Sequence, residues 1–272
     1  MSNKIEAVLF DWAGTTVDYG CFAPLEVFLE VFKRKGIDLT LEEARGPMGM
    51  LKIDHIRALT QIPRIKEQWV EVYGREPNEK DVKEMYEDFE PSLLKILPNY
   101  TTPIPGVVEA VKEIRDMGLK IGSTTGYTDK MMEIVKKGAK EKGYEPDTLF
   151  TPDGLPGGRP YPWMCYENAK KLGVYPMNHI IKVGDTLSDV KEGVNAGCWS
   201  VGVIMGSNEL GLHEEEVLAM PYDELSTRCK EVRERFLNAG AHFVIKTMSE
   251  LPDLIKKINN LLQEGKTQYS IV

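Results

Sequence analysis

The sequence predicts an α/β protein: a doubly wound parallel sheet with a small all-helical domain inserted after its first strand. Three observations predict this fold class. The chain opens with a short apolar run, residues 5–10, of the kind that forms a strand buried on both faces. Residues 22–97 then show only helical patterns, and from Gly106 onward helix and strand patterns alternate. Such alternation is typical of parallel sheets covered by helices on both faces.

The composition is that of an ordinary soluble globular protein, with 42% hydrophobic and 28% charged residues among 272. The formal net charge is −8, from 34 Lys and Arg against 42 Asp and Glu, and there is no basic block. This balance argues against nucleic acid or an anionic membrane as a partner. Four scattered cysteines indicate neither a zinc site nor a disulfide framework. Because no signal-peptide layout and no apolar run of roughly 18 residues occurs, we expect a cytoplasmic protein.

The helical block follows a turn of small residues after the first strand. A capping-box pattern of Thr40 and Glu43 predicts one helix start. The other helices are expected at Pro24–Gly36, around Ile53–Leu59, at Ile65–Tyr73 and at Asp81–Leu94. The block is too long to be one crossover between sheet strands. We therefore expect a cap domain, residues 21–98, inserted into a core domain made of residues 1–20 and 99–272.

The alternating part supplies the rest of the predicted sheet. Its strands are expected at Leu119–Ser123, Thr148–Thr151, Ile180–Val183, Ser200–Ile204 and His242–Ile245. Its helices are expected at Val107–Met117, Thr128–Lys142 with Thr128 as N-cap, Trp163–Leu172, Ser188–Ala196, Tyr222–Leu237 and Ser249–Leu262. From Gln263 onward we expect a frayed polar tail.

Polar residues follow three of the predicted strands, where open parallel sheets place their chemistry. Asp11 follows the first strand and Thr125 follows the second. Asp185 follows the fourth strand, and Asp189 lies four residues after it. A carboxylate that attacks phosphorus needs a hard cation beside it. Asp11 and Asp185, with the carbonyl oxygen of Ala13, can hold Mg²⁺.

Two further residues suit phosphoryl transfer. Thr125 can donate a hydrogen bond to the transferring phosphoryl group, and Arg159, in a Gly/Pro-rich loop, supplies positive charge. The whole set resembles the haloacid dehalogenase (HAD) superfamily. The matching motifs are Asp11 to Thr15, Ser123 to Gly126, Arg159, and Gly184 to Asp189. The resemblance implies an Asp11 nucleophile and a cap at the place where the helical block lies. One position departs from the pattern, because HAD phosphatases usually carry a second Asp where this chain has Ala13.

Three longer segments resemble the phosphonoacetaldehyde hydrolase, or phosphonatase, family within that superfamily. They are residues 10–21, 47–55 and 158–164, and the resemblance extends over essentially the whole chain. It implies that Lys52 forms a Schiff base with the substrate aldehyde, that Asp11 takes the phosphoryl group, and that Mg²⁺ is the cofactor. It also implies a homodimer, through the cap domains. The implied catalytic residues include Thr125, Arg159, His55 and Asp189, and the implied substrate-binding residues are Cys21, Met48, Gly49, Gly126 and Tyr127.

The chemistry of a C–P bond makes Ala13 intelligible. Cleavage without help would expel a carbanion, whereas a protonated imine accepts the electron pair and gives a neutral enamine. No acid is then needed at position 13. An ordinary lysine is almost wholly charged at neutral pH, so Lys52 must be desolvated or placed near positive charge. His55, on the same helical face, is a candidate for proton transfer.

Several alternatives stay open at this level. Without the family resemblance, Lys52 is best interpreted as a solvated surface lysine, and His55 as a helix-surface histidine. Cys21 is better explained as pocket lining than as a nucleophile. A sugar-phosphate phosphatase or phosphomutase is the main alternative function, and Ala13 argues against it. A metal-free dehalogenase would not need Asp185 with Asp189, and the intact motifs argue against a catalytically silent binding protein.

Overall fold

The computed structural model describes residues 3–270. Its sheet has six parallel strands in the order β3-β2-β1-β4-β5-β6. Their bounds are β1 Ala7–Phe10, β2 Lys120–Thr124, β3 Thr148–Phe150, β4 Ile180–Gly184, β5 Trp199–Val203 and β6 Phe243–Ile245. The chain starts in the middle of the sheet and moves first to one edge and then to the other. This order confirms the predicted doubly wound sheet and puts a switch point beside β1, where such folds bind ligands.

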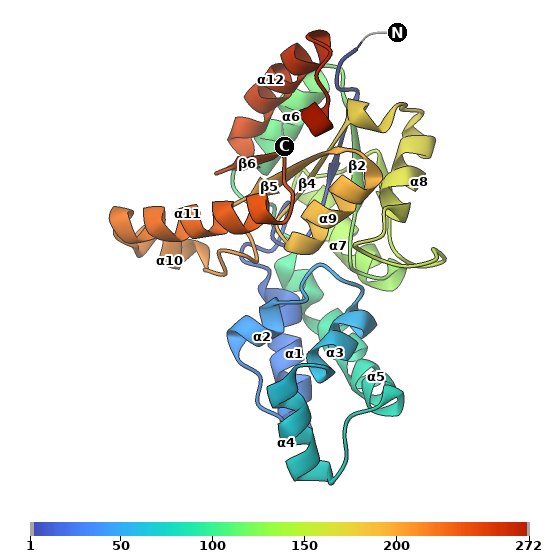
Figure 1. Cartoon of the computed structure of the whole chain (residues 1–272), viewed down its shortest axis with the longest axis vertical. Coiled ribbons are helices and arrows are strands. Elements are labelled where there is room, and N and C mark those ends of the chain that lie inside the picture. Colours follow the sequence, from blue (N-terminus) through green and yellow to red (C-terminus); the bar gives the residue numbers. More distant parts are fainter. Residues whose placement is uncertain (1–2, 271–272) are drawn as a thin grey trace.

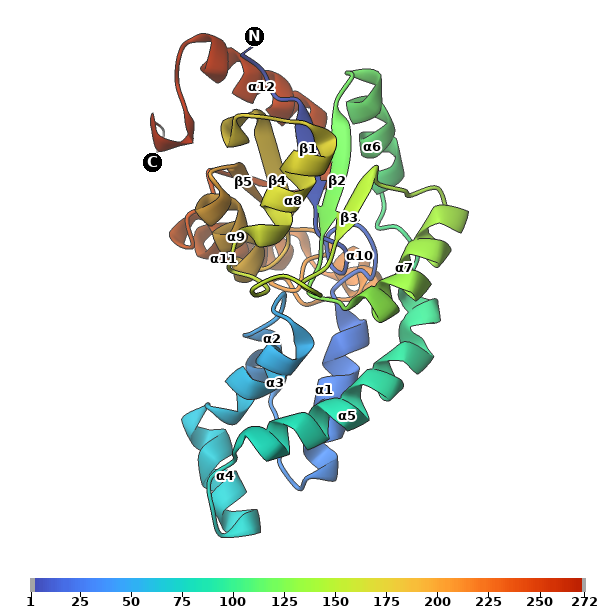
Figure 2. The same ribbon diagram turned by 90° about the vertical axis from the view of Figure 1, so that its right-hand side faces the viewer.

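The helices of the core cover both faces of the sheet, and Figure 2 shows α8 in front of the strands. Ala7 and Leu9 of β1 pack into one apolar cluster with α8, whereas Val8 and Phe10 pack into another with α6 and α12. This alternation follows from the two-residue period of a strand. The core helices are α6 Val107–Asp116, α7 Asp129–Glu141, α8 Trp163–Leu172, α9 Leu187–Ala196, α10 Glu214–Ala219, α11 Tyr222–Asn238 and α12 Leu251–Gln263.

Five helices separate β1 from α6 and form a group beyond the carboxyl ends of the strands (Figure 1). They are α1 Phe22–Arg34, α2 Leu41–Arg45, α3 Lys52–Thr60, α4 Pro63–Tyr73 and α5 Glu79–Ile96. The predicted capping box is present, because the Thr40 hydroxyl accepts from Glu43 N–H and the Glu43 carboxylate accepts from Thr40 N–H. The helical insert is thus observed; its treatment as a cap domain of residues 21–98 is our proposal.

The structure adds to the sequence expectations at two places, α10 and the N-cap Thr128, and corrects one, the frayed tail. Helix α10 was not predicted, because its six residues carry three glutamates and no apolar period. Thr128 is the N-cap of α7 but its hydroxyl makes no capping bond; the Asp153 carboxylate instead accepts from Asp129 N–H at 2.8 Å. The described part of the tail is not frayed, because Gln268 is buried and its Nε2 donates to the carbonyl oxygen of Gly197 at 2.8 Å.

Among the helices of residues 3–270, none combines the length and apolar character needed to cross a membrane.

Candidate active site

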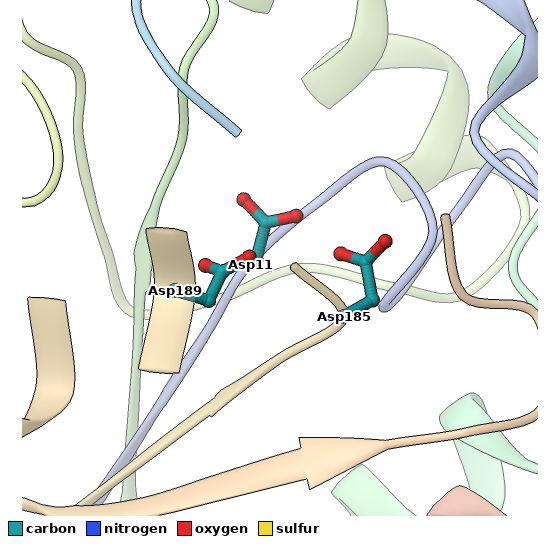
Figure 3. A group of neighbouring side chains, drawn as sticks. All are labelled: Asp11, Asp185 and Asp189. Atoms are coloured by element: carbon teal, nitrogen blue, oxygen red, sulfur yellow. The ribbon is translucent and has the colours of Figure 1, made fainter. Parts of the chain in front are cut away.

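Three carboxylates meet at the carboxyl ends of β1 and β4 (Figure 3). Asp11 follows β1, Asp185 follows β4, and Asp189 lies in the first turn of α9; one oxygen of each lies within 4.8 Å of the others. All three side chains are buried. Asp185 Oδ1 accepts from the hydroxyl of Thr15 and Oδ2 from the N–H of Asn208, both at 2.8 Å. The predicted convergence of strand ends is therefore observed.

The charge in and around this cluster suits a divalent cation. Four buried carboxylates lie together: Asp11, Asp185, Asp189 and Glu192. Among the described residues, Arg159 and Lys182 form ion pairs with three of them, whereas Asp185 forms none. Burial, followed by the charges of Asp11 and Asp189, raises the pKa of Asp185 well above its usual value. Within residues 3–270 its only hydrogen-bond donors are neutral. Buried charges are normally paired, so this donor set fits a metal ion bound by oxygen.

Arg159 is held by three carboxylates at once. Its Nη2 lies 2.7 Å from Asp11 Oδ1, its Nη1 3.1 Å from Asp189 Oδ1, and its Nε 2.9 Å from Glu192 Oε2. Each nitrogen of the guanidinium thus has a carboxylate partner, and the planar arrangement of its donors fixes its orientation. Of these partners, Glu192 was not predicted. Its only sequence signal is its position three residues after Asp189, on the same face of α9.

Asp189 itself is engaged in structural contacts. Lys182 Nζ donates to its Oδ1 at 2.6 Å, and the hydroxyl of Thr186 donates to its Oδ2 at 2.6 Å. Arg159 and Lys182 keep the pKa of this carboxyl below its usual value although burial opposes them. Asp189 does not line the cavity described below. Lys182 was predicted only as part of a core strand, so its contact with Asp189 was not foreseen.

Lys52 approaches the carboxylates from the insert. It is the first residue of α3, and only 3% of its surface is exposed, so its interpretation as a solvated lysine is wrong. Burial lowers the pKa of Lys52, and the positive charge of Arg159 lowers it further. Cys21 and Asp11 act in the opposite direction and raise it, but burial outweighs them. The positive end of the α3 dipole adds to this effect. The Nζ lies 5.0 Å from the centre of the Tyr127 ring.

Lys52 and Asp11 border the same small cavity. Its lining contains Asp11, Ala13, Cys21, Met48, Gly49, Lys52, Thr125, Gly126, Tyr127, Arg159 and Thr186. All five residues predicted to bind substrate are therefore brought together. The cavity is about 10 Å³, which is room for about one water molecule. Larger cavities elsewhere on the surface lack this convergence of a buried lysine with buried carboxylates.

The cavity is small because the loop before α3 lies close against the core loops that follow β2 and β4. A Cβ on Gly126, after β2, would lie 2.6 Å from the carbonyl oxygen of Met50. Gly49 has φ +87°, and a Cβ there would lie 2.4 Å from the hydroxyl of Thr186. A side chain at either position would push the loop before α3 away from the core. The structure is therefore a closed form, with the loop before α3 seated on the core.

The remaining predicted residues differ in how they face the cavity. Thr125 Oγ1 accepts from Tyr127 N–H at 3.0 Å, so its own hydrogen is free to donate. Burial raises the pKa of Cys21 well above its usual value, which keeps it a thiol and fits pocket lining. His55 does not line the cavity; its Nε2 lies 2.9 Å from the carbonyl oxygen of Ala44 and must donate, because a carbonyl only accepts. Burial and Lys52 lower the pKa of His55.

Comparison with known proteins places this geometry in a family. The family model of haloacid dehalogenase-like hydrolases matches residues 5–197. Proteins called phosphonoacetaldehyde hydrolase in Bacillus cytotoxicus and Bacillus cereus are 64% and 63% identical over 255 residues, 94% of this chain and 97% of each relative. The chain belongs to the phosphonoacetaldehyde hydrolase family.

Solved structures agree with this family assignment. A phosphonoacetaldehyde hydrolase-like protein from Oleispira antarctica is 39% identical, with a TM-score of 0.95 over 98% of this chain and 96% of that one. A β-phosphoglucomutase from Clostridium difficile has a TM-score of 0.65 over 94% of this chain and 97% of that one, at 18% identity. The second likeness shows the fold alone. The family resemblance seen in the sequence is thus confirmed, and so is the HAD-type α/β fold.

Proposed function

We propose that this protein hydrolyses the C–P bond of phosphonoacetaldehyde to acetaldehyde and phosphate, in the degradation of phosphonates such as 2-aminoethylphosphonate. One observation carries the proposal beyond the family name: a buried lysine and a buried aspartate line one cavity, the lysine from the insert and the aspartate from the core. The direct test compares phosphate release from phosphonoacetaldehyde with release from a sugar phosphate. Release from the sugar phosphate alone would favour the alternative, a HAD-type phosphatase or phosphomutase.

In the first step, the neutral amine of Lys52 attacks the aldehyde carbon, and loss of water gives a protonated imine. The lowered pKa of Lys52 increases the fraction of free amine at neutral pH. Tyr127 and Cys21 line the wall beside the amine and exclude water. His55 is the candidate for the proton transfers of this step. Its ring lies 3.8 Å from that of Phe28, which Lys52 Nζ also faces at 6.0 Å, and its Nδ1 has no hydrogen-bond partner among residues 3–270.

In the second step, an oxygen of Asp11 attacks phosphorus and the C–P bond breaks. The electron pair of that bond moves into the imine, so the leaving group is an enamine rather than a carbanion. Thr125 can donate its free hydroxyl hydrogen to the phosphoryl group, and Arg159 orients the Asp11 carboxylate through its 2.7 Å contact with Oδ1. Protonation of the enamine at carbon and hydrolysis of the imine release acetaldehyde. Water then cleaves the aspartyl phosphate.

Asp11, Asp185 and the carbonyl oxygen of Ala13 would hold Mg²⁺, while Asp189 would keep Arg159 and Thr186 in place. The ion would supply the positive charge that balances the excess carboxylates and the phosphoryl oxygens. Homodimer formation through the cap helices and a cytoplasmic location stay predictions.

Removal of the metal is expected to stop phosphate release. EDTA should reduce the rate to background, and excess Mg²⁺ should restore it, because Asp11 and Asp185 would otherwise lie close together without the cation that both would bind. Asp185→Ala should lose the same activity yet stay folded, since it removes a buried carboxylate that repels Asp11 and Asp189. Colorimetric phosphate assays and thermal melts measure both effects. Full activity in chelator would contradict the metal assignment.

Ala13→Asp is expected to lower C–P cleavage rather than improve it. The new carboxylate would line the cavity that must accept an anionic phosphonate, and an enamine needs no oxygen acid. A decrease of about tenfold or more in kcat/KM is the expected scale for one added like charge at close range. A several-fold increase in phosphonatase activity would show that this explanation of Ala13 is wrong.

A further inference from the structure

Arg45, the last residue of α2, joins the helical insert to a loop of the core. Its Nη1 donates to the carbonyl oxygen of Gly20 at 2.8 Å and to Oδ1 of Asn208 at 3.0 Å. Longer contacts reach the carbonyl oxygens of Asn208 and Gly211, at 3.4 and 3.5 Å. Every one of these acceptors lies outside residues 21–98 and is neutral. The guanidinium also lies over the ring of Phe22, 4.8 Å from its centre.

Asn208 binds both sides of this junction. Its side-chain Nδ2 donates back to the carbonyl oxygen of Arg45 at 3.3 Å, which makes the pairing reciprocal. Its main-chain N–H donates to Oδ2 of Asp185 at 2.8 Å. Only 2% of its surface is exposed. One core residue thus contacts the insert with its side chain and the acidic cluster with its main chain.

The size of the cavity requires this junction to open and close. A space for about one water molecule cannot admit phosphonoacetaldehyde, so the insert must move away from the core for substrate to enter. Another ion pair across the boundary, Lys130 with Glu90 at 3.0 Å, has side chains 62% and 25% exposed. Exposed pairs of that kind contribute little. The Arg45 contacts are more sheltered and more numerous.

We propose that Arg45 is a positioning residue that latches the insert onto the core and, through Asn208, links closure to the placement of Asp185. The proposal rests on the proposed function, because it assigns Arg45 to closing the site in which Lys52 meets substrate. It requires that loss of the latch exposes Lys52 even when no substrate is present.

The test uses reductive methylation of the substrate-free, full-length protein. Formaldehyde condenses with a lysine amine, with loss of water, and cyanoborohydride reduces the imine to a methylamine. Peptide mass spectrometry then gives the rate at Lys52, with exposed Lys33 in the same chain as an internal reference. The variants are Arg45→Ala, Asn208→Ala and the pair. Arg64→Ala is the matched control, because Arg64 is also an arginine of the insert but its partners in the described part of the chain are Glu43 and the carbonyl oxygen of Asp38, both in the insert.

Arg45→Ala and Asn208→Ala are each expected to raise the Lys52 rate about tenfold, the scale of one lost hydrogen bond to a charged group. The increase in the pair should be smaller than the product of the two single increases, because the bond from Arg45 Nη1 to Asn208 Oδ1 is lost in both single variants. Arg64→Ala should match the unaltered protein. Should Arg45→Ala fail to fold in a thermal melt, Asn208→Ala, which keeps the main-chain bond to Asp185, decides alone.

Two results would overturn the latch. One is a Lys52 rate in Arg45→Ala equal to that of the unaltered protein. The other is an equal increase in Arg64→Ala, which would show a general loosening of the insert. Failure of the proposed function is a separate result: an unaltered protein that releases no phosphate from phosphonoacetaldehyde, whatever the methylation rates.

Discussion

Lys52→Arg is expected to abolish both imine formation and phosphate release from phosphonoacetaldehyde. A guanidinium keeps the positive charge but stays protonated, so it cannot attack an aldehyde. The loss should be on the order of a thousandfold or more in kcat, the scale seen when a covalent catalyst loses its nucleophile. Borohydride added with the substrate should inactivate the unaltered protein irreversibly. Mass spectrometry should place the reduced adduct on Lys52.

The matched control is Lys33→Arg, an exposed position on α1 of the insert, which should change neither quantity. An adduct on a different lysine, or near-normal turnover of Lys52→Arg, would remove the chemical reason for assigning C–P cleavage to this chain. The buried Lys182 is a poor competitor, because its Nζ already donates to Asp189.

Asp11→Asn is expected to separate the two steps. The amide cannot act as nucleophile toward phosphorus, so phosphate release should fall by a factor on the order of a thousand or more. Imine formation uses Lys52 and should continue, so borohydride should still trap the substrate on that residue. The Asp11→Asn variant should also accumulate no phosphorylated enzyme in rapid-quench experiments.

Asp88→Asn, an exposed position on α5, is the corresponding control and should behave like the unaltered protein. Normal phosphate release from Asp11→Asn would show that water attacks phosphorus directly. If Asp11→Asn loses both imine formation and phosphate release, Asp11 is also needed for the reaction of Lys52. The assignment of the two steps to two different residues would then be wrong.

The catalytic edge of the sheet was predictable because parallel strands carry a simple rule. Asp11 and Asp185 each follow a short apolar run, and the ends of such strands meet in space, so their proximity needs no further information. Lys52 is different. Nothing in its own helix indicates that it is buried, because the surface that covers it comes from α1 and from the loop after β2. Only the family resemblance pointed to it.

The contacts that hold the site were the least predictable part. Glu192 and Lys182 each look ordinary in sequence, one on a helix and one in a strand. Their role depends on Arg159, which lies in a separate loop: Glu192 pairs with Arg159, and Lys182 pairs with Glu192. Asn208 acts on Asp185 through its main-chain N–H, a group that every residue except proline has. A role of this kind leaves no mark in the side-chain pattern.

The contact of Gly49 and Gly126 with the opposite loop has a consequence for substrate choice. Because the closed cavity is only about 10 Å³, we expect every bound aldehyde to hold these loops apart, and a longer one to hold them farther apart. A bulkier phosphonate can still dock its phosphonate group on the open core, but it would act as a wedge that keeps the amine out of reach. The enzyme would then discriminate between substrates after binding, by whether the insert can close onto the core. We expect such a compound to act as a competitive inhibitor with little or no turnover.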